Sequence, residues 1–383
     1  KFVTPGLDGS IWVANWFDNS VQQIVNTNGV LTAQPAIVVS SGRNTVAAMT
    51  TGLDGSIWVS IRGAVRQIVN QSGVWTAQPP ISAPPKQGDD FYPESLTPGL
   101  DGSIWAGNMA ADAVASFVLG QVQQIVNQGG VWAVQPGIEV GQPVFQSQSA
   151  PYDLTTGLDG SIWAAHGGTS SKSYVQQVVN KSGVWTAQPM MDMLGFNGPF
   201  ALTTGLDGSI WVLNSGSGGP WPGGSVQQIV NNNGVWTAQP VTRVGNASAI
   251  TTALDGSIWV ANTGALILDE STWETPGNVQ QIVLPPQSGP INLAAVFGPA
   301  AGQMTLGWQP PPANGGSPVV SYTATVRQGE YSQTITTSST SVVFDGLTLG
   351  SGPTYFTVTA ANFAGVSATV GHFIDAAGNT IPQ

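Results

Sequence analysis

The sequence of 383 residues contains no cysteine. This absence excludes disulfide bonds, thiolate metal sites and thiol nucleophiles. Charged side chains make up only 8% of the chain, and the nine lysines and arginines are scattered singly among 20 acidic residues. With a net charge of −11 and no basic stripe, we expect neither a nucleic acid nor an anionic membrane as a partner. No apolar run of about 18 residues occurs, so the sequence predicts no transmembrane segment.

The chain opens on Lys1-Phe2-Val3, residues typical of a strand, and shows no charged leader followed by an apolar stretch. The lack of cysteine fits a secreted protein without redox chemistry, although a cytosolic protein can have the same composition. We expect an extracellular or cell-surface protein whose signal peptide has been removed.

The residues that are abundant favour strands over helices. Glycine (49) and proline (27) are frequent, and much of the remainder is Val, Thr, Ser, Gln, Asn and Trp. These residues suit strands and turns, whereas exposed helix faces would call for Ala, Leu, Glu and Lys. We therefore expect an all-β protein, and its length predicts two domains.

One six-residue motif, Leu-Asp-Gly-Ser-Ile-Trp, recurs at intervals of 46 to 58 residues. A segment resembling Val-Gln-Gln-Ile-Val follows each copy, and Gly-Val-Trp-Thr-Ala-Gln-Pro or a close variant follows the first five. Asp-Gly signals a tight turn, and a segment that ends in proline suits an edge strand. With one more short strand before each Asp-Gly, the unit has four strands, which predicts the blades of a six-bladed β-propeller. The six copies begin at Leu7, Leu53, Leu100, Leu158, Leu206 and Leu254.

The repeated aromatic and acidic residues have a structural interpretation. The turn aspartates are explained by the tight turn itself. The motif tryptophans are expected to fill the space between blades, because large aromatics bury much apolar area. For the tryptophans of the outer segment, core packing and an exposed contact surface both remain open. These outer residues are Trp75, Trp132, Trp185 and Trp236.

The sequence of the repeats resembles the Asp-Gly-x-x-Trp-Val repeats of two-component-regulator and streptogramin-lyase-like propellers, over residues 1–284. The resemblance implies the fold but not one activity, because such propellers carry unrelated functions. In streptogramin lyases a histidine acts as general base beside a Mg²⁺ that a glutamate holds. His166 is the one histidine of the predicted propeller and the candidate for that role, with Asp153 or Asp192 as a nearby acid. No glutamate pairs with it by repeat position, so we predict neither a metal site nor a cofactor.

Comparison of the repeats separates two faces of the predicted propeller. The turn between the third and fourth strands keeps one length, whereas the loops on the other face differ from blade to blade. Variable loops carry specificity, so we expect that face to bind any ligand. It is rich in aromatic residues suited to sugar stacking or protein contact. The candidate ligand-binding residues are Trp16, Phe17, Phe91, Tyr92, Tyr152, Trp221 and Trp273.

The sixth unit lacks the Gly-Val-Trp-Thr-Ala-Gln-Pro segment and runs into a Pro-rich linker at 285–290. One outer strand of the propeller is therefore unaccounted for. Either this blade has three strands, or a segment outside the sequence or from another molecule completes it. An unpaired outer edge invites strand addition.

Residues 291–377 read as seven short alternating strands, which predicts an immunoglobulin-like β-sandwich. Trp308 before three prolines, Tyr322 in the next strand and Tyr355 before Val358-Thr359-Ala360 resemble a fibronectin type III domain. That resemblance implies a spacer or adhesive module. Residues 378–383 are expected to form a frayed tail.

These observations favour a non-enzymatic extracellular structural or adhesive protein. We expect it to self-assemble as a surface-layer or filament subunit through the incomplete sixth blade and the sandwich. The first alternative is a carbohydrate-binding propeller that uses the aromatic loops. The second is a Mg²⁺-dependent lyase centred on His166.

Overall fold

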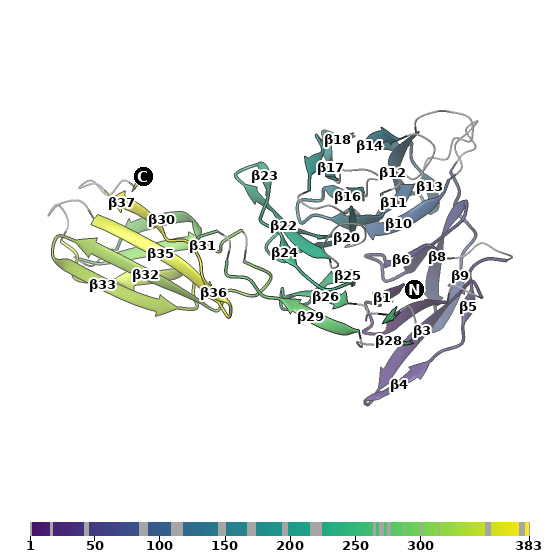
Figure 1. The fold of residues 1–383 in the computed structure, drawn as a ribbon, viewed down its shortest axis with the longest axis horizontal. Coiled ribbons are helices and arrows are strands. Elements are labelled where there is room, and N and C mark those ends of the chain that lie inside the picture. Colours follow the sequence, from purple (N-terminus) through teal and green to yellow (C-terminus); the bar gives the residue numbers. More distant parts are fainter. Residues whose placement is uncertain are drawn as a thin grey trace. The chain divides into compact units, whose positions relative to one another are not determined.

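The fold is seen in a computed structural model (Figure 1). The described residues are 2–15, 18–41, 46–83, 91–108, 118–144, 151–166, 174–193, 198–214, 224–262, 266–267, 272–273, 277–286, 288–298, 300, 302–312, 314–348, 354–374 and 380–382. Among them every regular element is a strand, so no described helix is available to cross a membrane. One compact unit comprises Lys1–Leu202, Val212–Val226 and Val241–Asn246, and the other comprises Thr203–Trp211, Gln227–Pro240 and Ala247–Gln383.

Six antiparallel sheets follow one another along the first three quarters of the chain, and we number them as blades one to six. Their first strands are β1 (Val3–Pro5), β6 (Ala48–Thr51), β10 (Pro93–Pro98), β15 (Asp153–Thr156), β20 (Pro199–Thr204) and β25 (Ala247–Thr252). Their second strands are β2 (Ile11–Asn15), β7 (Ile57–Ile61), β11 (Ile104–Asn108), β16 (Ile162–His166), β21 (Ile210–Asn214) and β26 (Ile258–Asn262). Their third strands are β3 (Ser20–Thr27), β8 (Ala64–Gln71), β12 (Val118–Gln128), β17 (Tyr174–Lys181), β22 (Ser225–Asn232) and β29 (Asn278–Ile282).

The outer part of blades one to five is built by strands that pair with the third strand. Fourth strands occur in blades one to five: β4 (Val30–Ala33), β9 (Val74–Ala77), β13 (Val131–Val134), β18 (Val184–Ala187) and β23 (Val235–Ala238). A short fifth strand joins four of these blades: β5 (Ile37–Val38), β14 (Ile138–Val144), β19 (Met191–Asp192) and β24 (Thr242–Arg243). Blade two has an isolated bridge between Val65 and Ile81 at the same place. A separate hairpin pairs β27 (Leu266–Ile267) with β28 (Thr272–Trp273). The predicted all-β fold with a propeller of six blade sheets is confirmed.

The second strands carry the core of the blades. In β7, β11, β16 and β21 every residue is buried, as expected for a short continuous apolar run covered on both faces. The motif tryptophans of blades one to five are at most 1% exposed. Each described pair joins a motif tryptophan to the outer-strand tryptophan of the next blade, edge to face. The ring centroids lie 4.8 Å apart for Trp12 and Trp75, 4.6 Å for Trp58 and Trp132, and 4.5 Å for Trp105 and Trp185.

Threonines on the first strands link neighbouring blades by hydrogen bonds. The hydroxyls of Thr4 and Thr51 lie 3.1 Å apart, and Thr51 also donates to the carbonyl of Pro5 at 2.6 Å. The same contact joins blades three and four at Thr97 and Thr156, at 3.2 Å. Since first strands of different blades make no backbone ladder with each other, these side-chain bonds satisfy polar groups at the contact.

The turn aspartates stabilise their own turns, as the sequence predicts. In blade one, Asp8 Oδ1 accepts hydrogen bonds from the amide of Ser10 at 3.0 Å and from its hydroxyl at 2.6 Å. Its other oxygen, Oδ2, accepts a hydrogen bond from Gln23 on the third strand at 3.0 Å. Gly9 has a φ of 81°, which favours glycine. Turn and third strand are therefore held together through one carboxylate.

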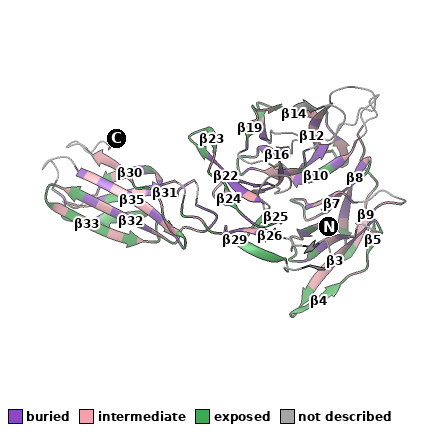
Figure 2. Ribbon diagram, viewed as in Figure 1, coloured by how far each residue is buried: buried purple, intermediate pink, exposed green. Residues whose placement is uncertain are grey.

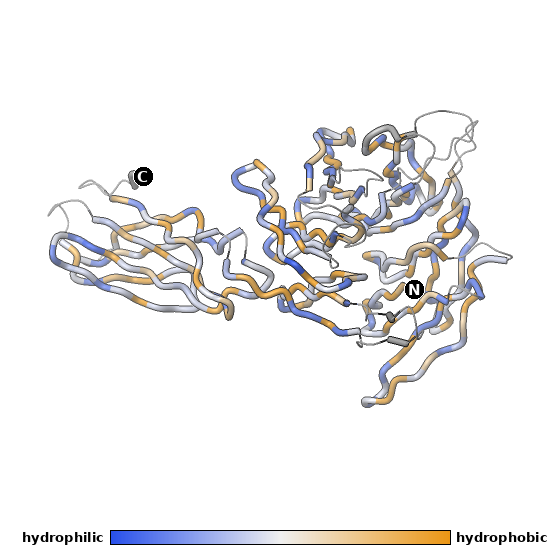
Figure 3. The backbone as a smooth tube through the Cα atoms, in the orientation of Figure 1, coloured by the Kyte–Doolittle hydropathy of each residue, from blue (hydrophilic) through white to orange (hydrophobic). Residues whose placement is uncertain are grey.

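The chain after blade six forms a two-sheet sandwich. One sheet contains β30 (Ile291–Phe297), β31 (Met304–Gln309) and β34 (Ser341–Phe344). The other contains β33 (Tyr331–Thr337), β32 (Ser321–Gln328), β35 (Thr354–Asn362), β37 (Val370–Ile374) and β38 (Thr380–Pro382), with β36 (Gly365–Val366) paired to β35. Burial alternates along β35, as Figure 2 shows, because one face of the strand lies against the core. Figure 3 colours the backbone by hydropathy; along β35 the buried Phe356, Val358 and Ala360 are apolar, whereas Thr357 and Thr359 between them are polar. The sandwich is thus observed, and its assignment to the fibronectin type III family stays a prediction.

Candidate functional site

In blades one to five, two segments cover the outer side of the third strand. The fourth strand pairs with one half of it, and a short return segment pairs with the other half, as Ile37 does with Val21 in blade one. The first valine of the repeated Val-Gln-Gln-Ile-Val segment consequently lies inside the blade. It is 0–1% exposed at Val21, Val65, Val122, Val175 and Val226.

Blade six differs at this place. Within the described residues, β29 pairs with β26 alone, and neither a fourth strand nor a return segment covers its outer side. Val279, the counterpart of Val21, is 66% exposed, and Asn278 and Gln280 beside it are exposed as well. Val283, just past the strand, is 39% exposed. The strand therefore offers an edge with apolar side chains to solvent, the usual acceptor of an added strand.

His166 lies at the end of β16 and is 2% exposed. Its ring stacks on that of Tyr174 with 5.1 Å between centroids, and neither ring nitrogen has a hydrogen-bond partner among the described residues. Burial lowers the pKa of His166 to about 4, so the ring is neutral at physiological pH. A general base that acts on a ligand at the surface must be reachable from solvent, and the buried His166 side chain is not.

The two acids predicted near His166 are placed differently. Asp192 is exposed and is the cross-strand neighbour of Tyr174 on β19. Asp153 lies on β15, where its two oxygens accept hydrogen bonds from the amides of Leu154 at 2.9 Å and Leu202 at 2.8 Å. Burial raises the pKa of Asp153 to about 7, against the effect of those two amides. Among the described residues, no three His, Cys, Asp or Glu side chains gather as metal ligands would.

The aromatic residues predicted to bind a ligand do not form one described surface. Phe91 is 6% exposed and packs in an apolar cluster with Trp58 and Leu96, so it is core rather than platform. Tyr92 is half-buried, and its hydroxyl accepts a hydrogen bond from Arg62 at 2.8 Å. Tyr152 is 42% exposed.

The side chains of the other predicted aromatic residues are not among those that the structure describes. Trp16, Phe17 and Trp221 lie outside the described residues. Trp273 is paired with Leu266 in the hairpin of β27 and β28, and its side chain is not among those described. Ligand binding on this face therefore stays a prediction.

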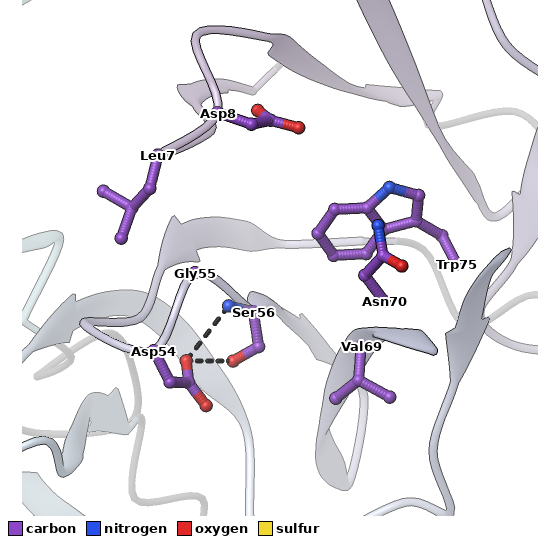
Figure 4. A pocket seen from close by; sticks show the side chains of 8 residues that line it. All are labelled: Leu7, Asp8, Asp54, Gly55, Ser56, Val69, Asn70 and Trp75. Carbon is purple, nitrogen blue, oxygen red and sulfur yellow. Dashed lines mark hydrogen bonds between the residues drawn. The ribbon is translucent and has the colours of Figure 1, made fainter. Parts of the chain in front are cut away.

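A pocket of about 400 Å³ lies between blades one and two on the face of the repeated turns. Asp8 lies on one side of it and Asp54, which accepts hydrogen bonds from Ser56, lies across from Asp8 (Figure 4). Asn70 and Trp75 line it from the third and fourth strands of blade two. All of these residues come from the repeated segments; the sequence predicts a structural role for the turn residues and leaves core packing and a contact surface both open for Trp75.

Three comparisons with known proteins bear on the fold. No protein-family model and no curated protein matches the sequence. Among solved structures, the chain is similar to a catalytically inactive virginiamycin B lyase from Staphylococcus aureus with quinupristin, with a TM-score of 0.50 and 16% identity over 80% of this chain and 91% of that one. It is also similar to a putative 6-phosphogluconolactonase from Bacteroides fragilis, with a TM-score of 0.54 and 14% identity over 73% of this chain and 86% of that one. A protein from Lactobacillus plantarum has a TM-score of 0.53 and 12% identity over 73% of this chain and 87% of that one. At this identity the likeness concerns the fold alone, and the resemblance to streptogramin-lyase-like propellers holds at that level.

Proposed function

We propose that this chain is a non-enzymatic extracellular structural protein that assembles by accepting a β-strand from a neighbouring copy at the outer edge of blade six. One observation carries the proposal: Val279 is 66% exposed, whereas its five counterparts are 0–1% exposed. In the other blades the same strand sequence is covered on that side. Strand addition at an open edge gains main-chain hydrogen bonds and buries apolar side chains together.

The chain itself indicates the sequence that such an edge accepts. In blades one, three, four and five, a return segment pairs with the first valine of the repeated third-strand segment, as Ile138 does with Val122. Since Val279 is the counterpart of that valine, we propose that the donor strand resembles these return segments. The boundaries of 1–284 for the propeller and 291–377 for the sandwich are part of the same proposal.

The environment of His166 supports this function over a lyase. The ring is buried, neutral and stacked on Tyr174, and the aspartate on β15 is engaged by two backbone amides. The lyase and the 6-phosphogluconolactonase that share the fold are less than 25% identical to this chain. Fold likeness at that level carries no activity across.

The test compares two valines that are equally exposed on strands. Val279 on β29 and Val296 on β30 are each 66% exposed, so neither substitution to aspartate removes a buried side chain. We expect the wild type and Val296→Asp to form oligomers with rising concentration, and Val279→Asp to remain monomeric, by analytical ultracentrifugation and electron microscopy. A wild type that stays monomeric at the highest soluble concentration, or a Val279→Asp chain that assembles equally well, overturns the proposal.

A peptide provides the direct measurement. A labelled peptide with the sequence of residues 137–144, which contains β14, should bind the full-length chain and inhibit its assembly. The Val279→Asp chain should bind it at least tenfold more weakly, which corresponds to about 1.4 kcal/mol. Equal binding by both chains would place the acceptor site elsewhere.

A further inference from the structure

Three residues of the loop between β31 and β32 of the sandwich contact the turns of blades five and six and the linker that follows β29. The amide of Asn314 donates a hydrogen bond to Asp207 Oδ2 at 3.1 Å. The carbonyl of Gly315 accepts one from the amide of Leu284 at 2.9 Å, and that of Gly316 accepts one from the amide of Ile258 at 3.1 Å. The loop is thus bound through its backbone, on both sides of the space between the two blades.

The same loop covers a tryptophan, Trp211, that has no aromatic partner among the described residues of the next blade. At three other junctions the motif tryptophan packs against the outer-strand tryptophan of the following blade at 4.5–4.8 Å. Blade six has no fourth strand among the described residues, so Trp211 cannot make that contact. Gly316 lies there instead: a Cβ on it would come within 3.2 Å of Trp211 and 3.3 Å of Ile258. Trp211 is nevertheless only 1% exposed.

A buried asparagine holds the loop and the linker together. Asn362, at the end of β35, is 6% exposed and donates to the carbonyls of Leu284 at 2.6 Å and Asn314 at 2.8 Å. Its Oδ1 accepts from the amides of Ala364 and Gly365, so both ends of the side chain are used. Gly315 fits because it has no side chain: it has a φ of 76°, and a Cβ on it would overlap the carbonyl oxygen of Leu284.

We propose that the sandwich domain closes the junction between blades five and six, where Asn314–Gly316 takes the place of the missing outer-strand tryptophan. The two blades thus bind the glycine turn of the same chain's sandwich at this junction. The sandwich is consequently required for the stability of the sixth blade. This proposal does not depend on strand addition, which concerns the outer side of β29. Blade six and the sandwich also fall in one compact unit.

The turn aspartates at this junction agree with the proposal. Burial raises the pKa of Asp207, although hydrogen bonds from Ser209 and Asn314 act in the opposite direction. At Asp255, the corresponding turn of blade six, the hydroxyl and amide of Ser257 hold the pKa below its ordinary value. The loop shields Asp207 from solvent and leaves Asp255 exposed.

The test uses two glycines of the sandwich that share a backbone conformation. Gly315 and Gly329 have φ of 76° and 58°, but a Cβ on Gly329 would meet nothing within 4 Å. Both alanine variants carry the left-handed strain, and only Gly315→Ala also clashes with the linker. In the full-length chain we expect Gly315→Ala to raise hydrogen exchange at the amides of Leu284 and Ile258 at least tenfold. Gly329→Ala should leave both amides as protected as in the wild type.

Thermal unfolding gives a second readout. Blade six and the sandwich should unfold in one transition in the wild type and in Gly329→Ala, and in two transitions in Gly315→Ala. If Gly315→Ala does not fold, Asn362→Ala replaces it, with Thr334→Ala as the control, since Thr334 is exposed and its hydroxyl hydrogen-bonds that of Thr325 within the sandwich. Unchanged exchange at Leu284 and Ile258, or equal effects of a variant and its control, overturns the proposal.

Discussion

At the scale of single residues, the same residue type has different surroundings at equivalent places in the repeat. Trp105 is fully buried against Trp185, while Trp259, its counterpart in blade six, is only half-buried. Val21 is buried and Val279 is exposed, although both begin a Val-Gln-Gln-Ile-Val segment. The difference comes from neighbouring strands, so the surroundings of a side chain cannot be assigned from its local sequence alone.

The buried tryptophans should dominate the stability of the blades. We expect Trp105→Ala to lower the free energy of unfolding by about 3–5 kcal/mol, because it leaves a large cavity between two blades. Phe363→Ala is the control, since Phe363 is 83% exposed, and it should change stability by less than about 0.5 kcal/mol. Urea unfolding measures both. A loss below about 1 kcal/mol for Trp105→Ala would contradict its place in the core.

Asp153 and His166 should change the free energy of unfolding in opposite directions between pH 4 and pH 7. The pKa of Asp153 is raised to about 7 in the folded chain, so its contribution to stability is present below its ordinary pKa of 3.8 and is lost as the pH rises through 7. The pKa of His166 is lowered to about 4, so its contribution is lost as the pH falls from 6.5 through 4.

Single variants separate the two effects. Relative to the wild type, Asp153→Asn should be more stable at pH 8 than at pH 5, by a difference on the order of 2 kcal/mol in urea unfolding. His166→Gln should show the reverse, gaining on the wild type as the pH falls. A difference between wild type and variant that stays constant with pH would mean that the substituted group keeps its ordinary pKa in the folded chain.

At the scale of elements, the hairpin between the third and fourth strands has one turn position with a positive φ, and three residue types occupy it in different blades. Its first turn residue has a positive φ in every described case and is occupied by asparagine at Asn28 and Asn233, by serine at Ser72 and Ser182, and by Gly129. A glycine follows each of them, and an asparagine two residues before, such as Asn70, accepts a hydrogen bond from that glycine amide at 2.7 Å. Asparagine and glycine tolerate this conformation better than serine does.

Replacing the serine should therefore stabilise the hairpin. We expect Ser72→Asn to raise the free energy of unfolding by about 0.5 kcal/mol, because the new residue is the one used at the same position in blades one and five. The reverse change, Asn233→Ser, should lower it by a similar amount. Thermal unfolding of both variants measures the effect, and equal signs would refute this account of the turn.

The sequence predicts much of the element scale and less of the site. The six blade sheets, the turn role of the aspartates and the buried motif tryptophans follow from strand propensity, turn chemistry and apolar area. The docking of Asn314 on Asp207 could not be predicted, because 107 residues separate them and no local pattern encodes a contact between two loops. The prediction of Phe91 as a ligand contact is wrong: it lies in the core, because aromatic residues after a loop can fold inward as readily as outward.

At the scale of the whole molecule, the net charge of −11 bears on assembly. Copies of an acidic chain repel each other, and salt screens that repulsion, since the Debye length falls from about 30 Å at 0.01 M to about 8 Å at 0.15 M. If assembly proceeds by strand addition at β29, whose exposed side chains are uncharged, it should increase with salt. Light scattering at low salt and at physiological salt measures this. Oligomers that dissociate as salt is added would instead indicate an interface held by ion pairs.

The near-identity of the repeated segments has a consequence for folding. Neighbouring blades meet through the same residue types at the described junctions, so a propeller assembled one blade out of phase would lose little at each individual contact. Such a phase error is the repeat-protein form of misassembly. The glycine turn of the sandwich fits where a third strand has no fourth strand beside it, and only blade six offers that among the described residues. Docking of this turn would therefore stabilise only the propeller in which blade six is the last blade, and it would favour that arrangement over one assembled out of phase.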